Sequence, residues 1–409
     1  MNERIITGID IGTSKVCTVI AELAKDGVLD IIGEGSAPSE GVRRGSIVNL
    51  EKATLAIQSS LRAAERVAGI PFPGRALVGV NGSYAKSFLV HGAKELEHDF
   101  VEAQDLEAVV ESAQSSGLSA EYQFLHSSAV SYELDGKTDI KDPTGMAGSR
   151  LGAQVFLAGS PQGELANLRQ AVEAAGVYPE SWVLASYASA LATLNSDELA
   201  QNVLLLDIGA GISQGIVFQQ GSPIYSTTVP LGGSLISSDI AQILKIPFEE
   251  AERVKKKYGA ALPELADPDL ALEVSSDSGA AGTLPASELA RYIRPRVLEI
   301  LGHCQQAFQP TLDEQRITLD QVVLTGGATL LKGSEELAQR LLGLPVRIGR
   351  PQGISGLTQE VSSPAHATVV GLVRYAAIKG AGAASESRVV EPVPVSWWGR
   401  IRNSFKNFF

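Results

Sequence analysis

The stretches GIDIGTSK at residues 8–15 and LLLDIGAGISQG at residues 204–215 share one pattern. In each stretch an apolar run ends in Asp-Ile-Gly, and a second run rich in apolar residues follows the glycine turn. Two such runs separated by a short turn that contains glycine are typical of a β-hairpin. Because the pattern occurs at the start of the chain and again near its middle, it predicts an internally duplicated α/β protein with one hairpin in each half.

Regular elements are expected on both sides of these hairpins. A helix is predicted from about Leu50 to Ala68, with Gly69 as its end. Its apolar face is expected to contain Leu55, Leu61, Ala64 and Ala68. Further helices are expected near 164–175 and 185–194, and VVLTGGA at 322–328 predicts a third strand followed by a glycine turn.

The stretch 76–160 differs from its surroundings and is interpreted as a small α+β unit set inside the larger pattern. Strands are expected near 76–80, 88–90, 130–134 and 155–157, with a helix near 101–115. Within this unit GKT at 136–138 ends like a P-loop, but Ser131 stands where the first glycine would be. Asp135-Gly136 is therefore interpreted as the tip of a β-hairpin.

Composition excludes several classes of protein. The chain has 409 residues, of which 44% are hydrophobic and 20% are charged, a balance typical of globular domains. The formal charge of −12 argues against nucleic acid as a partner and against attachment to anionic lipid over the whole surface. No apolar run reaches the ~18 residues of a spanning helix, and no signal peptide is recognised at the start.

Cysteine and histidine give no signal for a disulfide or a metal site. Cys17 and Cys304 stand alone, and the five histidines show no ligand spacing. We therefore expect two packed or idle thiols and no thiolate metal centre. The histidines are expected on the surface or in the core.

The glycine turns indicate a phosphate site. Without a Cβ, glycine lets backbone N–H groups approach phosphate oxygens, and two facing hairpins would hold a triphosphate from both sides. The expected contacts are Gly12, Thr13, Ser14 and Lys15 in the first hairpin and Gly209, Ala210, Gly211 and Ser213 in the second. Asp10 and Asp207, at the strand ends, are expected to hold a hydrated Mg²⁺, a cation that prefers carboxylate oxygens and water.

At this point the sequence resembles the superfamily of actin, Hsp70 and the sugar kinases. The two hairpins resemble its first and second phosphate motifs, and LTGGATLLKG at 324–333 resembles its adenosine motif. Residues 251–255 are similar to the helix that borders the ribose and base of the nucleotide. The resemblance adds Gly232, Gly233, Glu252, Lys255, Gly326 and Gly327 to the expected ATP contacts.

Within that superfamily the chain is most similar to the FtsA family of bacterial cell-division proteins. IITGIDIGTSKVCTVIAEL at 5–23, the α+β insertion and a basic amphipathic tail carry the likeness. The implied fold is α/β, a two-lobed actin-like ATPase fold with an inserted α+β subdomain and a C-terminal amphipathic helix. The implied division is 1–83 and 163–196 for the first lobe, 84–162 for the insertion, 197–232 and 300–380 for the second lobe, 233–299 for its smaller subdomain, 381–395 for a linker and 396–409 for the helix.

The resemblance also implies a function. It implies a protein at the cytoplasmic side of the inner membrane that binds ATP with Mg²⁺, polymerises, and ties the FtsZ filament to that membrane. Other division proteins are further expected partners. In the bacterial actin MreB a Glu-Pro pair begins the helix that here starts with Ala185 and Ser186. Because no carboxylate stands there to orient the attacking water, we expect slow hydrolysis at most, and the catalytic residues remain unknown.

The C-terminal residues are basic, in contrast to the acidic chain as a whole. After Glu391 there is no acidic residue, and on a helix the large apolar side chains fall within an arc of about 120° flanked by basic ones. We expect this face to bind anionic lipid, and the alternative is docking on the protein's own body or on a partner groove. The face comprises Trp397, Trp398, Arg400, Ile401, Arg402, Phe405, Lys406, Phe408 and Phe409.

The sequence leaves open the contact with FtsZ and two alternative functions. In the FtsA family the C-terminal peptide of FtsZ docks on the smaller subdomain, where Arg294 and Arg296 could meet an acidic peptide, with Asp239 nearby. Ordinary solvated charges explain these residues equally well. Two other functions compete with a division protein: a PilM-like adaptor of pilus assembly, and a sugar or acetate kinase of the same fold.

Overall fold

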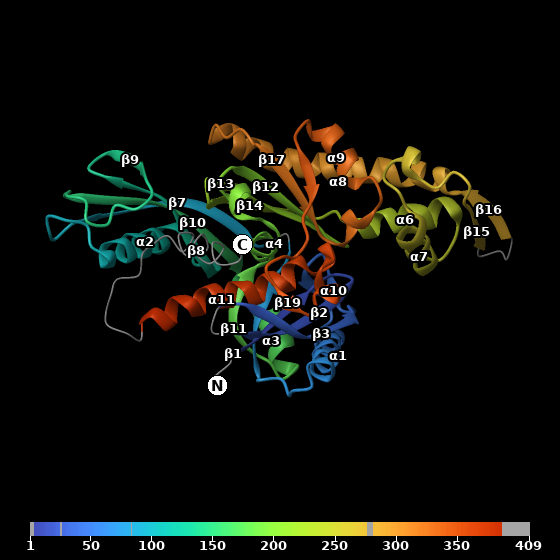
Figure 1. Cartoon of the computed structure of the whole chain (residues 1–409), viewed down its shortest axis with the longest axis horizontal. Helices are drawn as coiled ribbons and strands as arrows, with labels where there is room; N and C mark the ends of the chain where they lie inside the picture. Colours follow the sequence, from blue (N-terminus) through green and yellow to red (C-terminus); the bar gives the residue numbers. More distant parts are fainter. Residues whose placement is uncertain (1–3, 25–26, 83, 276–280, 387–409) are drawn as a thin grey trace.

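The computed structural model describes residues 4–24, 27–82, 84–275 and 281–386. They form two lobes, each built on its own central sheet (Figure 1). In Figure 1 two smaller units lie on either side of the second lobe: residues 86–161, which contain β7 to β10, on the left, and residues 233–258, which form α6 and α7, on the right. The predicted α/β class is confirmed.

The two central sheets have the same topology. The first has the order β11-β6-β1-β2-β3-β19, and the second has the order β14-β13-β12-β17-β18. In the first sheet β3, β2 and β1 are antiparallel neighbours, and β6 and β11 follow in parallel. In the second sheet β14, β13 and β12 are antiparallel neighbours, and β17 and β18 follow in parallel. The first sheet has one additional strand, β19, beside β3. The predicted duplication is therefore confirmed strand by strand. The strands are β1 (Arg4–Ile11), β2 (Lys15–Leu23), β3 (Leu29–Pro38), β6 (Arg75–Val80), β11 (Tyr178–Leu184), β19 (Ser355–Gly356), β12 (Asn202–Ile208), β13 (Ser213–Gln219), β14 (Ser222–Val229), β17 (Gln321–Thr325) and β18 (Val346–Ile348).

One helix covers the outer face of each sheet. α1 (Leu50–Ala68) packs on β2 and β3, and α8 (Ala286–Glu314) packs on β13 and β14. α1 begins after Asn49, whose side chain accepts a hydrogen bond from the Lys52 N–H, and ends at Gly69 in the left-handed conformation, as predicted. Leu55 was expected in its apolar face but is 54% exposed, because the buried stripe runs instead through smaller residues and Ile57.

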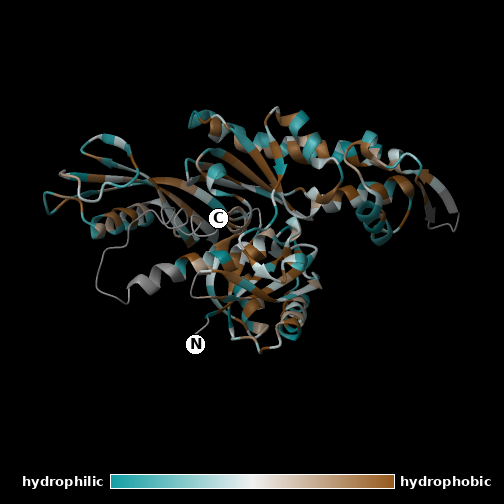
Figure 2. Cartoon of the chain, in the orientation of Figure 1, coloured by the Kyte–Doolittle hydropathy of each residue, from teal (hydrophilic) through white to brown (hydrophobic). Residues whose placement is uncertain are grey.

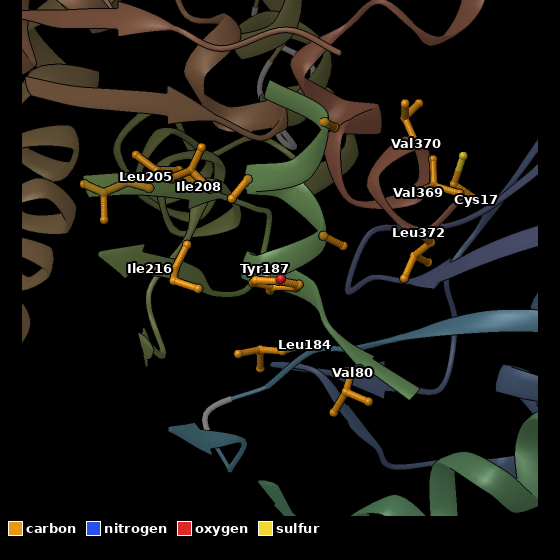
Figure 3. Packing of buried hydrophobic residues seen from close by; sticks show 14 of the residues in the cluster. Cys17, Val80, Leu184, Tyr187, Leu205, Ile208, Ile216, Val369, Val370 and Leu372 are labelled. Atoms are coloured by element: carbon orange, nitrogen blue, oxygen red, sulfur yellow. The ribbon is translucent and has the colours of Figure 1, made fainter. Parts of the chain in front are cut away.

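Two further helices cross between the lobes. α4 (Ala185–Thr193) packs on β12 and β13 of the second sheet, although it precedes that sheet in the chain. α11 (Ala367–Glu386) packs on β1, β2 and β6 of the first sheet, although it follows the second. The helices touch where a Cβ on Gly371 would overlap the backbone of Ala188. Figure 3 shows the apolar side chains of both helices at this crossing.

The inserted unit is a four-stranded sheet with one helix. Its strands, in the order β7-β10-β8-β9, are β7 (Lys86–Glu95), β10 (Arg150–Pro161), β8 (Tyr122–Leu134) and β9 (Lys137–Ile140), and α2 (Ala103–Gly117) packs on β7 and β10. Part of it forms a separate hydrophobic cluster. Asp135 and Gly136, both with positive φ, form the predicted hairpin tip between β8 and β9.

The second lobe carries its own smaller unit. It contains α6 (Gly233–Leu244), α7 (Phe248–Tyr258) and the hairpin of β15 (Ala271–Ser275) and β16 (Ala281–Pro285). Apolar residues concentrate in the sheets, whereas the outer helix surfaces are mixed (Figure 2). The remaining elements are β4 (Val42–Arg43), β5 (Ser46–Ile47), α3 (Gln162–Ala174), α5 (Ser196–Leu199), η1 (Pro263–Leu265), η2 (Gly327–Leu330), α9 (Ser334–Leu342), α10 (Thr358–Val361) and η3 (Pro364–His366).

The end of the chain differs in part from expectation. α11 continues to Glu386, so the start of the range predicted as a linker, 381–395, is helical. Its run of Ala and Gly has few large apolar residues, which is why the sequence pattern suggested a linker. Residues 387–409, including every residue predicted to bind lipid, lie outside the described part of the chain. Within the described ranges, no helix is both long and apolar enough to cross a membrane.

Candidate functional site

A cavity of about 490 Å³ lies where the two glycine turns face each other between the lobes. Both hairpins contribute to it, together with α6, α7 and the loop after β17. Of the sequence-predicted residues, those that line it are Asp10, Gly12, Thr13, Ser14, Lys15, Asp207, Gly209, Ala210, Gly211, Gly233, Glu252, Lys255, Gly326 and Gly327. Residues up to 317 positions apart in the chain thus meet at one place, as the duplicated pattern suggested.

The two turns have the same backbone geometry. The Gly12 N–H donates to the Lys15 carbonyl at 3.0 Å, and the Gly209 N–H donates to the Ile212 carbonyl at 2.9 Å. The turns also approach each other: a Cβ built on Gly211 would lie 2.6 Å from Thr13 Oγ1. A side chain at Gly211 would therefore force the two hairpins apart or displace Thr13.

The two aspartates occupy equivalent positions at the ends of β1 and β12. Asn81 donates to Asp10 Oδ1 at 2.7 Å, whereas Ser189 and Thr368 donate to Asp207 Oδ2 at 2.7 and 3.2 Å. Burial raises the pKa of Asp10 to about 6, with a further upward contribution from the Asp207 charge. Burial also raises the pKa of Asp207, against the effect of its hydrogen bonds. Two buried carboxylates whose pKa values are raised are suited to a divalent cation, which would offset the charge of both.

One wall of the cavity comes from α6 and α7. Lys255 Nζ donates to Glu252 Oε2 at 2.6 Å and to the Gly233 carbonyl at 2.9 Å, and Ser237 donates to the same Glu252 oxygen. Lys255 is buried, and its ammonium fixes the start of α6 to α7. Gly326 has a φ of +89° and lies directly against Asp207. A side chain at this position would strain the backbone and would also overlap the Asp207 carboxylate.

Two predicted residues do not line the cavity. The Ser213 hydroxyl donates to the Leu231 carbonyl at 2.8 Å, and Ser213 is 1% exposed. Gly232 lies beside the backbone of Ala210, outside the lining. Ser213 is the first residue of β13, so the alternation of the strand turns its side chain away and turns that of Gln214 towards the cavity.

Several lining residues were not among the expected contacts, although some of them lie within the motifs at 204–215 and 324–333. Gln214 is paired with Asp207 in the hairpin register, and its Nε2 donates to Asn81 Oδ1 at 3.2 Å. Asn81 directly follows β6, the parallel neighbour of β1, and this pairing places it beside Asp10. The others are Ile212, Ile236, Lys256, Gly259, Ala328, Leu330, Leu331, Pro364, Ala365 and Thr368.

The start of α4 offers no carboxylate. Ala185 and Ser186 are both buried, and the Ser186 hydroxyl lies 2.9 Å from that of Ser226. Neither residue lines the cavity. This arrangement supplies no general base from α4 for the activation of water.

The residues expected to meet a partner peptide are partly occupied. Arg296 forms a bidentate ion pair with Asp239, at 2.6 and 2.9 Å, and also contacts Glu299. Arg294 on the same helix is exposed. Arg296 and Asp239 therefore join α8 to α6, which leaves Arg294 as the accessible charge of the three.

Comparison with known proteins identifies the family. Residues 204–371 match the family model for the cell division protein FtsA, and residues 82–158 match the SHS2 domain inserted in FtsA. The cell division protein FtsA of Pseudomonas aeruginosa is 33% identical over 377 residues, 91% of this chain and 89% of the relative. The chain belongs to the FtsA family.

Other FtsA proteins are similarly close. FtsA of Borreliella burgdorferi is 32% identical over 92% of this chain and 91% of its own length, and FtsA of Escherichia coli K12 is 31% identical over 91% and 90%. Family membership makes this a cell-division protein and does not favour the pilus-assembly or sugar-kinase alternatives.

Solved structures support the actin-like fold of this FtsA-family chain. The PilM–PilN type IV pilus biogenesis complex matches with a TM-score of 0.64 at 16% identity, over 91% of this chain and 98% of that one. MreB5 of Spiroplasma citri bound to AMPPNP matches with a TM-score of 0.54 at 14% identity, over 94% and 99%. At such identities these likenesses concern the fold alone.

Proposed function

We propose that the cavity between the lobes binds ATP with Mg²⁺. The observation that carries this proposal is the pair of identically closed glycine turns facing each other beside two buried aspartates. Backbone N–H groups of the turns and the Lys15 ammonium would bind the phosphates. Asp10 and Asp207 would hold Mg²⁺, partly through water, and the cation would offset the charge of the phosphates.

The remaining contacts would bind the nucleoside. Glu252 on α7 offers a carboxylate for ribose hydroxyls, while Gly326 and Gly327 leave room for the adenosine. The apolar lining contributed by Ile236, Leu330 and Leu331 would then cover the base. Because α4 brings no carboxylate to the cavity, we propose that hydrolysis is slow.

Calorimetric titration with ATP tests the proposal. With Mg²⁺ present, the full chain should bind ATP with 1:1 stoichiometry, and Asp207→Asn should weaken binding at least about tenfold, since one charged contact to the cation is lost. Asp313→Asn, the same substitution at an exposed position on α8, is the matched control and should bind normally. Absence of binding by the parent protein would overturn the assignment of the cavity.

We further propose that the protein polymerises and tethers FtsZ filaments to the cytoplasmic side of the membrane. Membership of the FtsA family supports the division role. The basic, Trp- and Phe-rich residues 396–409 support lipid attachment, because long basic side chains reach phosphate headgroups while the aromatic rings enter the interface. One such tail is a modest anchor, at ~1 kcal/mol per basic charge, so a filament with many tails would bind far more firmly.

Flotation with anionic vesicles tests the tether. The full chain should float, and removal of 396–409 should abolish flotation while ATP binding is kept. A double Trp397→Ser, Phe405→Ser variant should fail in the same way with all basic charges retained, since the apolar face would be lost. Unchanged flotation of the shortened chain would refute the tail as the anchor.

The FtsZ contact is proposed on the smaller unit of the second lobe. Arg294 is exposed there, and Ile243 and Phe248 are exposed apolar residues at 47% and 41% on α6 and α7. An extended acidic peptide could use the charge and the apolar side chains together. Arg294→Glu should therefore weaken binding of the FtsZ C-terminal peptide in fluorescence anisotropy, and Arg291→Glu, on the same helix, is the matched control.

A further inference from the structure

A second cluster of potential ligand atoms lies beside the cavity. Cys17 on β2, Glu34 on β3 and His366 in η3 place one sulfur, one carboxylate oxygen and one ring nitrogen within 4.8 Å of one another. Glu34 Oε1 is central, at 3.7 Å from Cys17 Sγ and 3.6 Å from His366 Nε2. The sequence gave no sign of this group, because its members are separated by up to 349 positions.

The spacing resembles the edges of a zinc tetrahedron. Zinc bonds of about 2.3 Å to sulfur and about 2.0–2.1 Å to nitrogen or oxygen give ligand-to-ligand separations of about 3.3–3.6 Å. The two separations that involve Glu34 exceed that range by at most a few tenths of an ångström, and the third, between Cys17 and His366, is at most 4.8 Å. The donor types also suit zinc, which takes thiolate, imidazole and carboxylate together, whereas Asp10 and Asp207 offer only oxygen.

A positive charge already lies at this cluster. Lys15 Nζ is 3.0 Å from His366 Nε2, so the ammonium faces the ring nitrogen that a metal would need. Lys15 also lines the cavity, and under the proposed function its ammonium binds nucleotide phosphate. When Lys15 turns to the phosphates, the ring nitrogen loses this partner and the Glu34 carboxylate loses a nearby positive charge.

We propose that Cys17, Glu34 and His366 form a zinc site that becomes available when Lys15 leaves His366 for the nucleotide. This proposal rests on the proposed ATP site for its regulation, but not for its ligands. The fourth coordination position would be taken by water. On binding, the Cys17 thiol releases its proton to solvent, and its sulfur, the Glu34 carboxylate and the neutral His366 ring each donate one electron pair.

The surroundings of the three ligands support the assignment. The Ser36 hydroxyl donates to Glu34 Oε1 at 2.6 Å and lies 3.5 Å from Cys17 Sγ, so it orients the carboxylate as outer hydrogen-bond partners of metal ligands do. Cys17 is 1% exposed, which keeps the sulfur away from oxidants but makes loss of its proton unfavourable without a metal.

Cobalt titration gives a direct test, because Co²⁺ replaces zinc and a thiolate ligand adds a sulfur-to-cobalt absorption band. In the full chain with excess Mg²⁺, addition of AMPPNP should tighten Co²⁺ binding about tenfold, a coupling typical of linked sites. Lys15→Met removes the competing ammonium and should bind Co²⁺ equally well with or without nucleotide. In the Lys15→Met background, Cys17→Ser should abolish the absorption band, and Ser36→Ala should weaken binding about 10–100-fold.

Matched controls separate the site from general effects on folding. Cys304→Ser replaces the other buried free thiol, and His303→Gln replaces an exposed histidine on α8; both should keep the band. Absence of the band in folded Lys15→Met protein would overturn the zinc site, whatever the nucleotide does. Failure of AMPPNP to bind the parent protein would overturn the proposed ATP site alone, since the Lys15→Met measurement needs no nucleotide.

Discussion

The β1–β2 turn and the β12–β13 turn are closed by equivalent backbone hydrogen bonds, yet they present different side chains. At the equivalent last position the first turn has Lys15, which reaches the His366–Glu34 pair, and the second has Ile212, which is 7% exposed. The two turns therefore share a backbone geometry but differ in the side chain at this position. The β1–β2 turn contributes a charge, and the β12–β13 turn contributes a buried apolar side chain.

The aspartates differ in the same sense. Asp10 accepts a hydrogen bond from the Asn81 amide, whereas Asp207 is held by two hydroxyls that come from the crossing helices α4 and α11. Asp207 is thus tied to both of the helices that join the lobes. Asp10 is tied to the sheet of its own lobe.

The largest effects should come from removing the side chain at the last position of each turn. Ile212→Ala should lower the free energy of unfolding by about 2–4 kcal/mol, because a buried side chain is lost, and should weaken ATP binding less than Lys15→Ala does, since Ile212 lines the cavity but carries no charge. Lys15→Ala should leave stability almost unchanged and weaken ATP binding about 10–100-fold, through loss of a charged contact. Urea unfolding and calorimetry measure the two quantities. Equal effects of both variants on ATP affinity would break the division of roles.

The second prediction concerns pH in the protein without nucleotide or Mg²⁺. The folded-state pKa of Asp10 is about 6 and its ordinary value is 3.8, so the folded protein binds the proton more tightly. Stability from this group is therefore present below about pH 4 and is lost as pH rises to about 6, by at most about 3 kcal/mol. Asp10→Asn should remove that loss, which urea unfolding from pH 4 to 7 would reveal. A difference between the two proteins that does not change with pH would contradict it.

A smaller effect should come from the contact between the turns. Gly211→Ala brings a methyl group against Thr13 and should weaken ATP binding about tenfold by displacing that side chain. A double-mutant cycle with Thr13→Gly should give an interaction energy of about 0.5–3 kcal/mol. Gly302→Ala is the control, because a Cβ there meets nothing within 4 Å. Additive effects of the two substitutions would show that the turns act independently.

The smallest effect should distinguish the two outer helices. α1 has a side-chain cap at Asn49, whereas α8 begins after Pro285, which makes no such hydrogen bond. Asn49→Ala should cost about 1 kcal/mol of stability, and Pro285→Ala should cost less, since no cap is lost. Thermal unfolding compares them directly. A larger loss of stability from Pro285→Ala than from Asn49→Ala would contradict this prediction.

Much of the fold could be predicted because its signals are local. The hairpins, the limits of α1 at Asn49 and Gly69 and the turn at Asp135-Gly136 depend on glycine conformation, capping and apolar runs within a few residues. Leu55 could not be placed, since a leucine at the edge of an amphipathic stripe is buried only if a neighbour covers it. Packing between distant segments decides that, and one sequence does not show it.

The site was predictable where the backbone alone decides a residue's place. Gly12, Gly209 and Gly211 have no side chain whose direction must be known, and they line the cavity as predicted. Ser213 was not, because its direction depends on where β13 begins. The group of Cys17, Glu34 and His366 could not be predicted, because its members come together only when η3 lies beside the first sheet.

The exchange of α4 and α11 makes the two halves of the duplication mutually dependent. α11, from the second half of the chain, covers one face of the first sheet, and α4, from the first half, packs on β12 and β13 as well as on β11 and β6. A gene cut between the lobes would therefore yield two fragments, each with an uncovered apolar sheet face and a helix that has lost its counterpart. The two halves therefore share a strand order, while the helices α4 and α11 that pack between the sheets bind them together.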